Sequence, residues 1–380
     1  MKKITSFCVI SILVINFQSV NAQSIIPKFI RKMYFETDSS KRPSFVLIPV
    51  LSTAPETGVE VGGGALYSFY TDTLAPGTRV SNYYGYATIT TKGQNRLQLS
   101  TDRWSPGNKY HYTVALNFVN FPNNFYGIGN NTRKADADLL DEKRFRFDAT
   151  AEKQVKHNLY IGFLAGAYYY RYNNKTVGGI YDTATNIEDK DGGPIAFVGP
   201  TLTFDSRDNV TYTTKGIRFA AQLRAIKGVF SNNDYVGGLL QVDVAEFIKL
   251  SNRFVLGLNA QTKNLLGGAS PFYLLPQMGN DELMRGYYGG RFRDRNLLAG
   301  QAELRYRISN RFGLVGFGGA GQVFKDDLTL SAFKPNLGGG LRYFFDVEKG
   351  LALRLDYGIG QRPLGEQRLS GFYVALGQAF

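Results

Sequence analysis

Alternation with a period of two residues is the feature that most restricts how this chain can fold. From about residue 45 to the last residue, segments of roughly ten residues carry apolar side chains at every second position. In one of them Tyr110, Tyr112 and Val114 alternate with His111 and Thr113. Successive side chains of a β-strand point to opposite faces, so the pattern predicts strands with one apolar and one polar face.

Sixteen segments of this kind follow one another along the chain. The predicted strands span residues 44–53, 57–71, 79–91, 94–104, 109–121, 143–156, 158–173, 194–207, 215–229, 233–250, 252–265, 298–309, 311–324, 332–346, 350–361 and 368–380. No run of 18 apolar residues follows residue 22, so no such segment can cross a bilayer as a helix. An even number of alternating strands is typical of a bacterial outer-membrane barrel, with apolar side chains toward lipid and charged or small ones toward the lumen.

We therefore predict an all-β fold, a 16-stranded antiparallel transmembrane β-barrel of the outer membrane, over residues 44–380. A soluble β-sandwich or propeller is the alternative, although no repeat of about 40 residues supports propeller blades.

The N-terminal residues predict export. Lys2 and Lys3 precede an apolar run that ends in a small-residue exit, so we expect a cleaved Sec signal peptide over residues 1–22. The expected location is the bacterial outer membrane. Residues 23–43 are then a short periplasmic segment with apolar side chains at helical spacing. An amphipathic helix and a frayed leader are both open interpretations of it.

The composition fits an exported barrel better than an enzyme or a nucleic-acid-binding protein. The chain has 24 Tyr, 28 Phe and 43 Gly, and its net charge is +13. No basic helix, zinc spacing or RNA-binding motif accompanies this charge, so nucleic acid is not expected as a partner. His111 falls in the predicted strand 109–121 and His157 in the predicted turn at Lys156-His157, and Cys8 lies in the N-terminal apolar run. We therefore expect no catalytic residue, no metal and no cofactor, and no role for either histidine.

The connections between the predicted strands fall into two length classes. Tight turns are expected to face the periplasm at Lys92-Gly93, Lys156-His157, Ser251-Asn252 and Asn310. Long connections are expected to face outward at residues 122–142, 174–193 and 266–297. Gly-, Asn- and Asp-rich stretches within the long connections suit exposed turns.

Two internal segments and the C-terminus carry a more specific signal. They read GPTLTFDSRDNVTYTTKGIRF from residue 199, MRGYYGGRFRDRNLLAGQAELRYRI from residue 284 and GFYVALGQAF from residue 371. Together they resemble the BamA/TamA-like outer-membrane assembly superfamily, also called the bacterial surface antigen family. The resemblance implies a sixteen-stranded barrel whose sixth outer loop folds back into the lumen. The strand count independently places residues 266–297 at that loop.

The resemblance also implies that an Arg-Gly-Tyr motif holds this loop in the lumen, and here the motif is Arg285, Gly286 and Tyr287. In the family the arginine docks on acidic residues of the inner wall. The strand that follows the loop strand carries an aspartate in relatives, but Gly319 stands in its place here. The arginine must therefore use other acceptors, because an unpaired buried charge is costly.

The candidate counter-charges for Arg285 are, first, Glu303 and Asp356 and, second, Asp205 and Asp208. A wall network beside them is expected to include Arg207, Arg305 and Arg307. The alternative is that these charges line a wet channel without specific pairing.

The C-terminal segment is similar to the closing strand of the family, with Phe372, Val374, Leu376 and Phe380 as the signal that the insertion machinery reads. The implied function is translocation or insertion of a protein or lipid at the outer membrane. We expect neither POTRA repeats nor a patatin-like domain before the barrel, and the expected partners are therefore outer-membrane lipid and a separate periplasmic protein or lipoprotein. The client is unknown. The alternatives are a passive or plugged channel and a surface antigen with no transport role.

Overall fold

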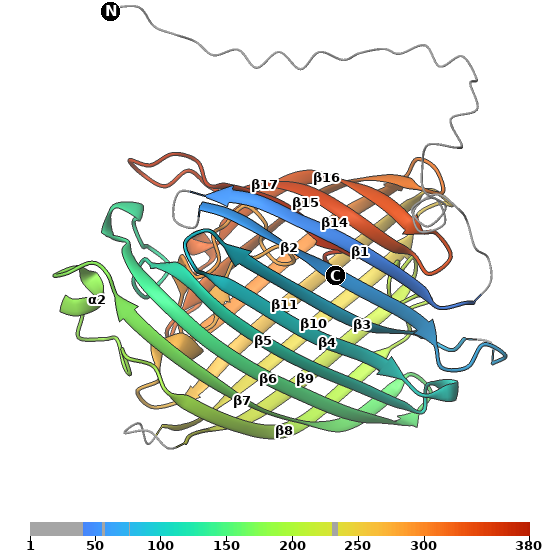
Figure 1. Ribbon diagram of the computed structural model, residues 1–380, viewed down its shortest axis with the longest axis horizontal. Helices are drawn as coiled ribbons and strands as arrows, with labels where there is room; N and C mark the ends of the chain where they lie inside the picture. Colours follow the sequence, from blue (N-terminus) through green and yellow to red (C-terminus); the bar gives the residue numbers. More distant parts are fainter. Residues whose placement is uncertain (1–40, 55–57, 76, 230–234) are drawn as a thin grey trace, which may run out of the picture. The chain divides into compact units, whose positions relative to one another are not determined.

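The computed structural model describes residues 41–54, 58–75, 77–229 and 235–380 (Figure 1). The prediction for residues 1–22, and that for residues 23–43 except the last three, lie outside the described residues. Sixteen strands form one antiparallel sheet in which each strand pairs with the next along the chain. The sixteen-stranded antiparallel sheet predicted from the sequence is therefore confirmed, and Figure 1 shows it curling into a barrel.

The strands of this sheet are β1 (Ser44–Ala54), β2 (Gly58–Tyr70), β3 (Val80–Thr90), β4 (Asn95–Trp104), β5 (Tyr110–Phe125), β6 (Asp138–Lys156), β7 (Leu159–Asn174), β8 (Pro194–Asp205), β9 (Gly216–Gly228), β10 (Val236–Lys249), β11 (Phe254–Gly267), β14 (Asn296–Arg307), β15 (Phe312–Phe324), β16 (Lys334–Asp346), β17 (Leu351–Ile359) and β18 (Ser370–Leu376). A two-stranded sheet of β12 (Gln277–Met278) and β13 (Phe292–Arg293) lies in the connection between β11 and β14. A one-turn helix, α2 (Ile180–Thr183), lies between β7 and β8.

The two faces of each strand differ as the alternation predicts. On β7, Ile161 and Phe163 are 48% and 69% exposed on the outer face, whereas Tyr160 and Leu164 on the inner face are 1% and 3% exposed. Apolar side chains that point away from the protein have no partner in water, but they match the acyl chains of a bilayer. The inner face is where charged side chains from distant strands meet.

Within the described residues, no helix is both long enough and apolar enough to cross a membrane.

The hairpin of β5 and β6 is longer than the sequence predicts. The two strands pair from Tyr110 opposite Lys153 to Phe125 opposite Asp138, so the ladder continues into residues 122–142, which the sequence assigned to a loop. Asn123 is the kind of residue that favours a turn, yet its side-chain amide donates to Glu142 Oε2 at 2.8 Å across the hairpin. The Asn123 side chain therefore bonds across the two strands and does not form the local turn that the sequence suggested.

The antiparallel order assigns every connection to one of two ends of the barrel. We call the end with residues 126–137, 175–193 and 268–295 the loop end, and the opposite end the turn end. The tight turns at His157, Asn252 and Asn310 lie at the turn end, but Lys92-Gly93 follows the third strand and lies at the loop end. The prediction that Lys92-Gly93 lies at the same end as the other tight turns is therefore wrong. The end of the barrel at which a turn lies depends on whether it follows an odd or an even strand of the sheet, and not on the length of the turn.

The last strand ends earlier than the sequence predicts. β18 stops at Leu376, and Gly377, with a φ of 79°, turns the chain away from the sheet. Phe372 and Val374 remain on the outer face at 66% and 58% exposed. Phe380 instead packs on Phe247, with ring centroids 5.9 Å apart. Glycine adopts positive φ without strain, and the alternation of the sequence gives no warning of this inward bend.

The outward orientation of Phe163 can be tested by placing a charge there. Phe163→Arg puts a guanidinium in the hydrocarbon layer, and we expect it to lower the free energy of unfolding by about 2–4 kcal/mol. The matched control is Thr150→Arg on the neighbouring strand β6, where the side chain lines the internal cavity. We expect this variant to lower the free energy of unfolding by about 1 kcal/mol or less. Urea unfolding in phospholipid vesicles measures both. Equal losses for the two variants would contradict the assigned faces.

Candidate functional site

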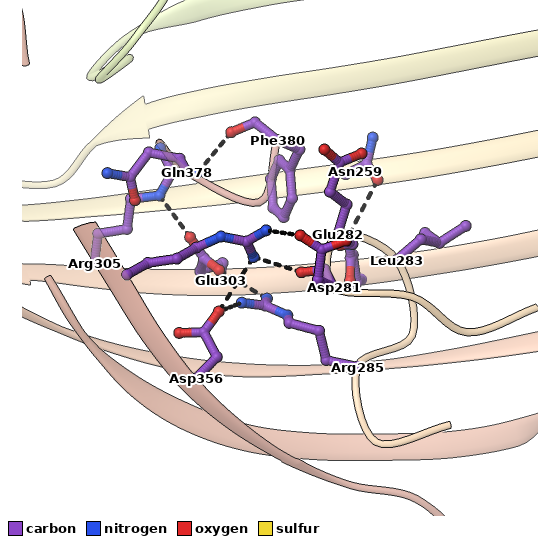
Figure 2. Close-up of polar contacts among 12 residues, drawn as sticks. Asn259, Asp281, Glu282, Leu283, Arg285, Glu303, Arg305, Asp356, Gln378 and Phe380 are labelled. Carbon is purple, nitrogen blue, oxygen red and sulfur yellow. Dashed lines mark hydrogen bonds and ion pairs between the residues drawn. The ribbon is translucent and has the colours of Figure 1, made fainter. Parts of the chain in front are cut away.

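The connection between β11 and β14, residues 268–295, folds back toward the inner wall, and we call it the lumen loop. Asn280 organises its tip, because the side-chain carbonyl accepts hydrogen bonds from the backbone N–H groups of Glu282 at 2.8 Å and Leu283 at 2.6 Å. Met284 has a positive φ of 56° and Gly286 a φ of 108°, so the chain reverses on both sides of Arg285. Figure 2 shows the result, with Arg285 pointing from the loop toward Glu303 and Asp356.

Arg285 has no exposed surface and lies between two carboxylates that are equally buried. Its Nη2 donates to Glu303 Oε2 at 2.7 Å and its Nη1 to Asp356 Oδ2 at 2.5 Å. The guanidinium also lies 3.5 Å from the centroid of the Phe317 ring on β15. Two charge-assisted hydrogen bonds and a cation–π contact offset the cost of taking this cation out of water.

The two carboxylates also accept hydrogen bonds from three arginines of the wall. Glu303 accepts from Arg305 Nε at 2.8 Å, and Asp356 accepts from Arg342 Nη1 and, at 3.4 Å, from Arg354 Nη1. Arg354 returns to the lumen loop, where its Nη2 lies 2.6 Å from Asp281 Oδ2. We call this set the charge network. Its members are Asp281 and Arg285 of the loop and Glu303, Arg305, Arg342, Arg354 and Asp356 of the wall.

Glycines allow the loop backbone to lie directly against β17. A Cβ on Gly286 would meet backbone atoms of Ile359 and Gly360 at 2.8 Å, and one on Gly358 would meet the Arg285 carbonyl oxygen at 2.6 Å. A side chain at Gly286 would displace the backbone at the end of β17, and one at Gly358 would displace the backbone of the lumen loop. Tyr287, the third residue of the motif, donates its hydroxyl to the Pro335 carbonyl at 2.6 Å. The Arg-Gly-Tyr motif therefore contacts the wall through all three of its residues.

Other predicted wall residues lie away from Arg285. Asp205 pairs with Arg79 at 2.7 Å and with Arg207 at 2.9 Å. Asp208 is exposed, and its carboxylate accepts the backbone N–H groups of Thr214 at 2.9 Å and Lys215 at 3.2 Å. The second-choice counter-charges are thus wrong, because both residues lie at the turn end, where one pairs with arginines near it and the other caps its own turn.

The assignment of Arg307 is also wrong. It shares the inner face with Glu303, but it lies at the last position of β14, where its Nε donates to the Ser309 carbonyl at 3.0 Å. Its guanidinium lies 3.3 Å from the centroid of the Phe344 ring. Strand parity correctly gives its face, but parity does not give the height of a residue along the barrel. Arg207 belongs to the separate pair with Asp205, and Arg305 joins the charge network.

The returning arm of the lumen loop is held at the loop end by Glu366. Arg291 Nη2 and the backbone N–H of Lys134 each donate to this carboxylate at 2.7 Å. Burial alone raises the pKa of Glu366, but these two hydrogen bonds outweigh it and lower the pKa. A lowered carboxyl pKa means that the contact contributes stability at neutral pH, and that this stability is lost as the pH falls through the lowered pKa.

The wall strands and the motif point to a known family. Residues 79–380 match the Omp85 superfamily domain. This chain belongs to the Omp85 superfamily. No protein of curated function is similar to it at the level of sequence. Omp85 proteins of this kind are outer-membrane β-barrels, which agrees with the apolar outer face of the strands.

Solved structures of the Omp85 fold overlie most of the chain. A BamA from Haemophilus ducreyi lacking POTRA domains 1–3 matches with a TM-score of 0.55 and 12% identity, covering 88% of this chain and 70% of that one. CdiB from Acinetobacter baumannii matches with a TM-score of 0.54 and 10% identity, covering 88% of this chain and 59% of that one. CdiB from Escherichia coli matches with a TM-score of 0.54 and 7% identity, covering 88% of this chain and 62% of that one. At these identities the likeness shows a shared fold.

One position of this Omp85 barrel is explained by the packing around it. Gly319 lies opposite Gln301, and a Cβ there would meet the Gly300 carbonyl oxygen at 2.4 Å. A carboxylate at residue 319 therefore has no room. Glu303, two residues farther along β14 and opposite Phe317, supplies the negative charge instead.

Sequence reasoning missed three of the seven members of the charge network, Asp281, Arg342 and Arg354, and one partly buried cluster around His111. Arg342 and Arg354 lie opposite each other on β16 and β17, and their inward parity is a signal that could have found them. His111 lies between Glu152 Oε2 at 2.9 Å and Asp102 Oδ1 at 3.2 Å. Sequence alone could not pair these residues, because they come from three strands. In the described part of the chain, no three His, Cys, Asp or Glu side chains are arranged to hold a metal ion.

A double-mutant cycle tests whether the loop depends on the charge network. Arg285→Ala removes one of the cations around two buried carboxylates, and we expect a loss of about 3 kcal/mol or more in the free energy of unfolding. Combined with Glu303→Gln, the loss should fall short of the sum of the single losses by about 1–3 kcal/mol, because the two share one contact. Combined with Asp208→Asn, a turn-end control, the losses should add within about 0.5 kcal/mol. Additivity in both pairs would contradict the contact.

Proposed function

We propose that this chain is an outer-membrane factor for the translocation or membrane insertion of a protein or lipid. The observation that supports the proposal is the lumen loop, which an Arg-Gly-Tyr motif holds on the inner wall of an Omp85 barrel by a fully buried ion pair. A passive pore gains nothing from a costly buried charge that fixes a loop across its lumen. In this proposal the loop end faces the cell exterior and the turn end faces the periplasm.

The proposed site of insertion is the seam between the first and last strands. The strand order begins with β1 and ends with β18. β18 pairs with β17 over seven residue pairs, whereas β1 pairs with β2 over eleven. A short last strand with a glycine at Gly371 has less to lose on opening, and its exposed edge can pair with a client strand. The proposed partners are outer-membrane lipid and a separate periplasmic protein or lipoprotein, and we propose no enzymatic activity.

Conductance tests the part of the proposal that concerns the loop. In planar bilayers we expect the native barrel to show small, fluctuating currents, because the lumen loop occupies the pore. Arg285→Ala should raise the mean conductance by about twofold or more, since the loop loses its buried ion pairs. Arg253→Ala, an exposed arginine of a turn, is the control and should leave it unchanged. A large ohmic pore in the native protein, unaffected by Arg285→Ala, would favour a passive channel.

Depletion in the native bacterium tests the function itself. We expect the loss of specific outer-membrane proteins or surface lipids from isolated outer membranes, measured by quantitative proteomics and lipid analysis. Restoration should require the native chain and should fail with Asp356→Asn, which removes one of the two carboxylates that hold Arg285. The exposed Asp208→Asn variant is the matched control, and it should restore the membrane. An unchanged outer membrane after depletion would leave the assembly role without support.

A further inference from the structure

The half of the lumen nearest the loop end contains a large polar cavity. Its volume is about 860 Å³, and its wall includes Arg96 of β4, Arg144 and Arg146 of β6, Arg224 of β9 and Lys263 of β11. The carboxylates in the same wall are Glu142 and Asp148. A volume of this size is typical of a site for a small ligand, and the wall carries five basic side chains against two acidic ones.

Three of the five cations have no carboxylate partner among the described residues. Glu142 forms an ion pair with Arg144 at 2.7 Å, and Asp148 forms one with Arg224 at 3.5 Å. Arg146 donates to the Tyr170 hydroxyl at 2.7 Å, and the guanidinium carbon of Arg96 lies 3.6 Å from the centroid of the Phe121 ring. The Lys263 ammonium has neither an ion pair nor a hydrogen bond in the described part of the chain. Elsewhere in this lumen, in the charge network and around Asp205, buried arginines are matched by carboxylates.

The other half of the lumen has the opposite balance. A second cavity of about 590 Å³ near the turn end is lined by five carboxylate side chains, three Arg or Lys side chains and His111. Its acidic residues are Asp102, Glu152, Asp205, Asp243 and Glu282. Lys263 lines both cavities, so it lies where the wall changes from an excess of basic to an excess of acidic side chains. An anion that enters from the loop end is attracted into the first cavity and repelled by the second, so it is retained rather than conducted.

The neutral lining of the first cavity indicates what the anion is attached to. Besides the charged groups, it presents phenol and amide groups, among them Tyr86, Gln98, Asn117, Tyr168, Gln222 and Gln241. Amides and hydroxyls both donate and accept hydrogen bonds, as the hydroxyls of a sugar require, and tyrosine rings offer faces for a sugar ring. Guanidinium groups bind phosphate through two parallel hydrogen bonds. The combination suits a sugar that carries phosphate groups.

We propose that the loop-end cavity binds a phosphorylated saccharide, with Arg146 and Lys263 as ligands of the phosphate groups. Such a group occurs as the headgroup of an outer-membrane glycolipid or as a free phosphorylated oligosaccharide, and the chemistry of recognition is the same for both. The site does not depend on whether the barrel inserts or translocates a client. It is separate from the charge network, because none of its cations belongs to that network.

Calorimetric titration of the full-length barrel in phospholipid nanodiscs tests the site. The probe is the deacylated lipid A backbone, a diglucosamine bisphosphate. We expect saturable binding that weakens as salt rises, because the contacts are ionic. The double variant Arg146→Gln/Lys263→Gln should raise the Kd about tenfold or more, since it removes two charge-assisted contacts. A heat-modifiable gel shift confirms that the variant is folded.

The control removes the same charge from the outer face of one strand. Lys143→Gln/Lys153→Gln alters two exposed residues of β6 that do not line the cavity, and it should leave the Kd within twofold of the native value. Binding of unphosphorylated diglucosamine as tightly as the probe would overturn the proposal. The same holds if inorganic phosphate displaces the probe at equal concentration, or if Arg146→Gln/Lys263→Gln binds as the native protein does.

A second titration separates the two sources of the ligand. Nanodiscs that contain lipid A present the same headgroup from the membrane. If lipid A in the nanodisc blocks the soluble probe, the ligand is a glycolipid headgroup that reaches the cavity. If the probe binds equally with and without lipid A, the ligand is a free phosphorylated oligosaccharide. Absence of probe binding in nanodiscs of either composition would overturn the site altogether.

Discussion

The interaction on which the rest of the site depends is the buried ion pair of Arg285 with Glu303 and Asp356. None of these three groups has exposed surface, so each is tolerated only in the presence of the others. The loop supplies the cation, and β14 and β17 supply the anions. A shift of either strand by one residue would turn its carboxylate to the lipid face. The position of the loop and the registers of the wall strands are therefore fixed together.

The sequence predicts the strands well, because alternation follows directly from a wall with lipid on one side and a polar lumen on the other. Parity and the motif together also single out Glu303 and Asp356, which the structure brings to Arg285. Parity fails for Asp205 and Arg307, since it states the face of a side chain but not its height in the barrel. Height depends on the tilt and stagger of the strands, which arise only when the sheet curls.

The remaining differences come from contacts between residues far apart in the sequence. Residues 371–380 alternate to the end, and only the inward turn at Gly377 and the packing of Phe380 on Phe247 show that the strand stops. His111 looks isolated along the chain, yet the neighbouring strands β4 and β6 bring carboxylates to both of its ring nitrogens. Such clusters need the register of three strands, which no local pattern contains.

The opposite charges of the two lumen halves also give the barrel an electrical polarity. Fixed positive charge in one half and fixed negative charge in the next form a junction in series, like that of a diode. Mobile ions deplete the junction under one sign of applied voltage and accumulate in it under the other, so current through an opened lumen is rectified. The direction of rectification then reports which end of the protein faces each side of a membrane.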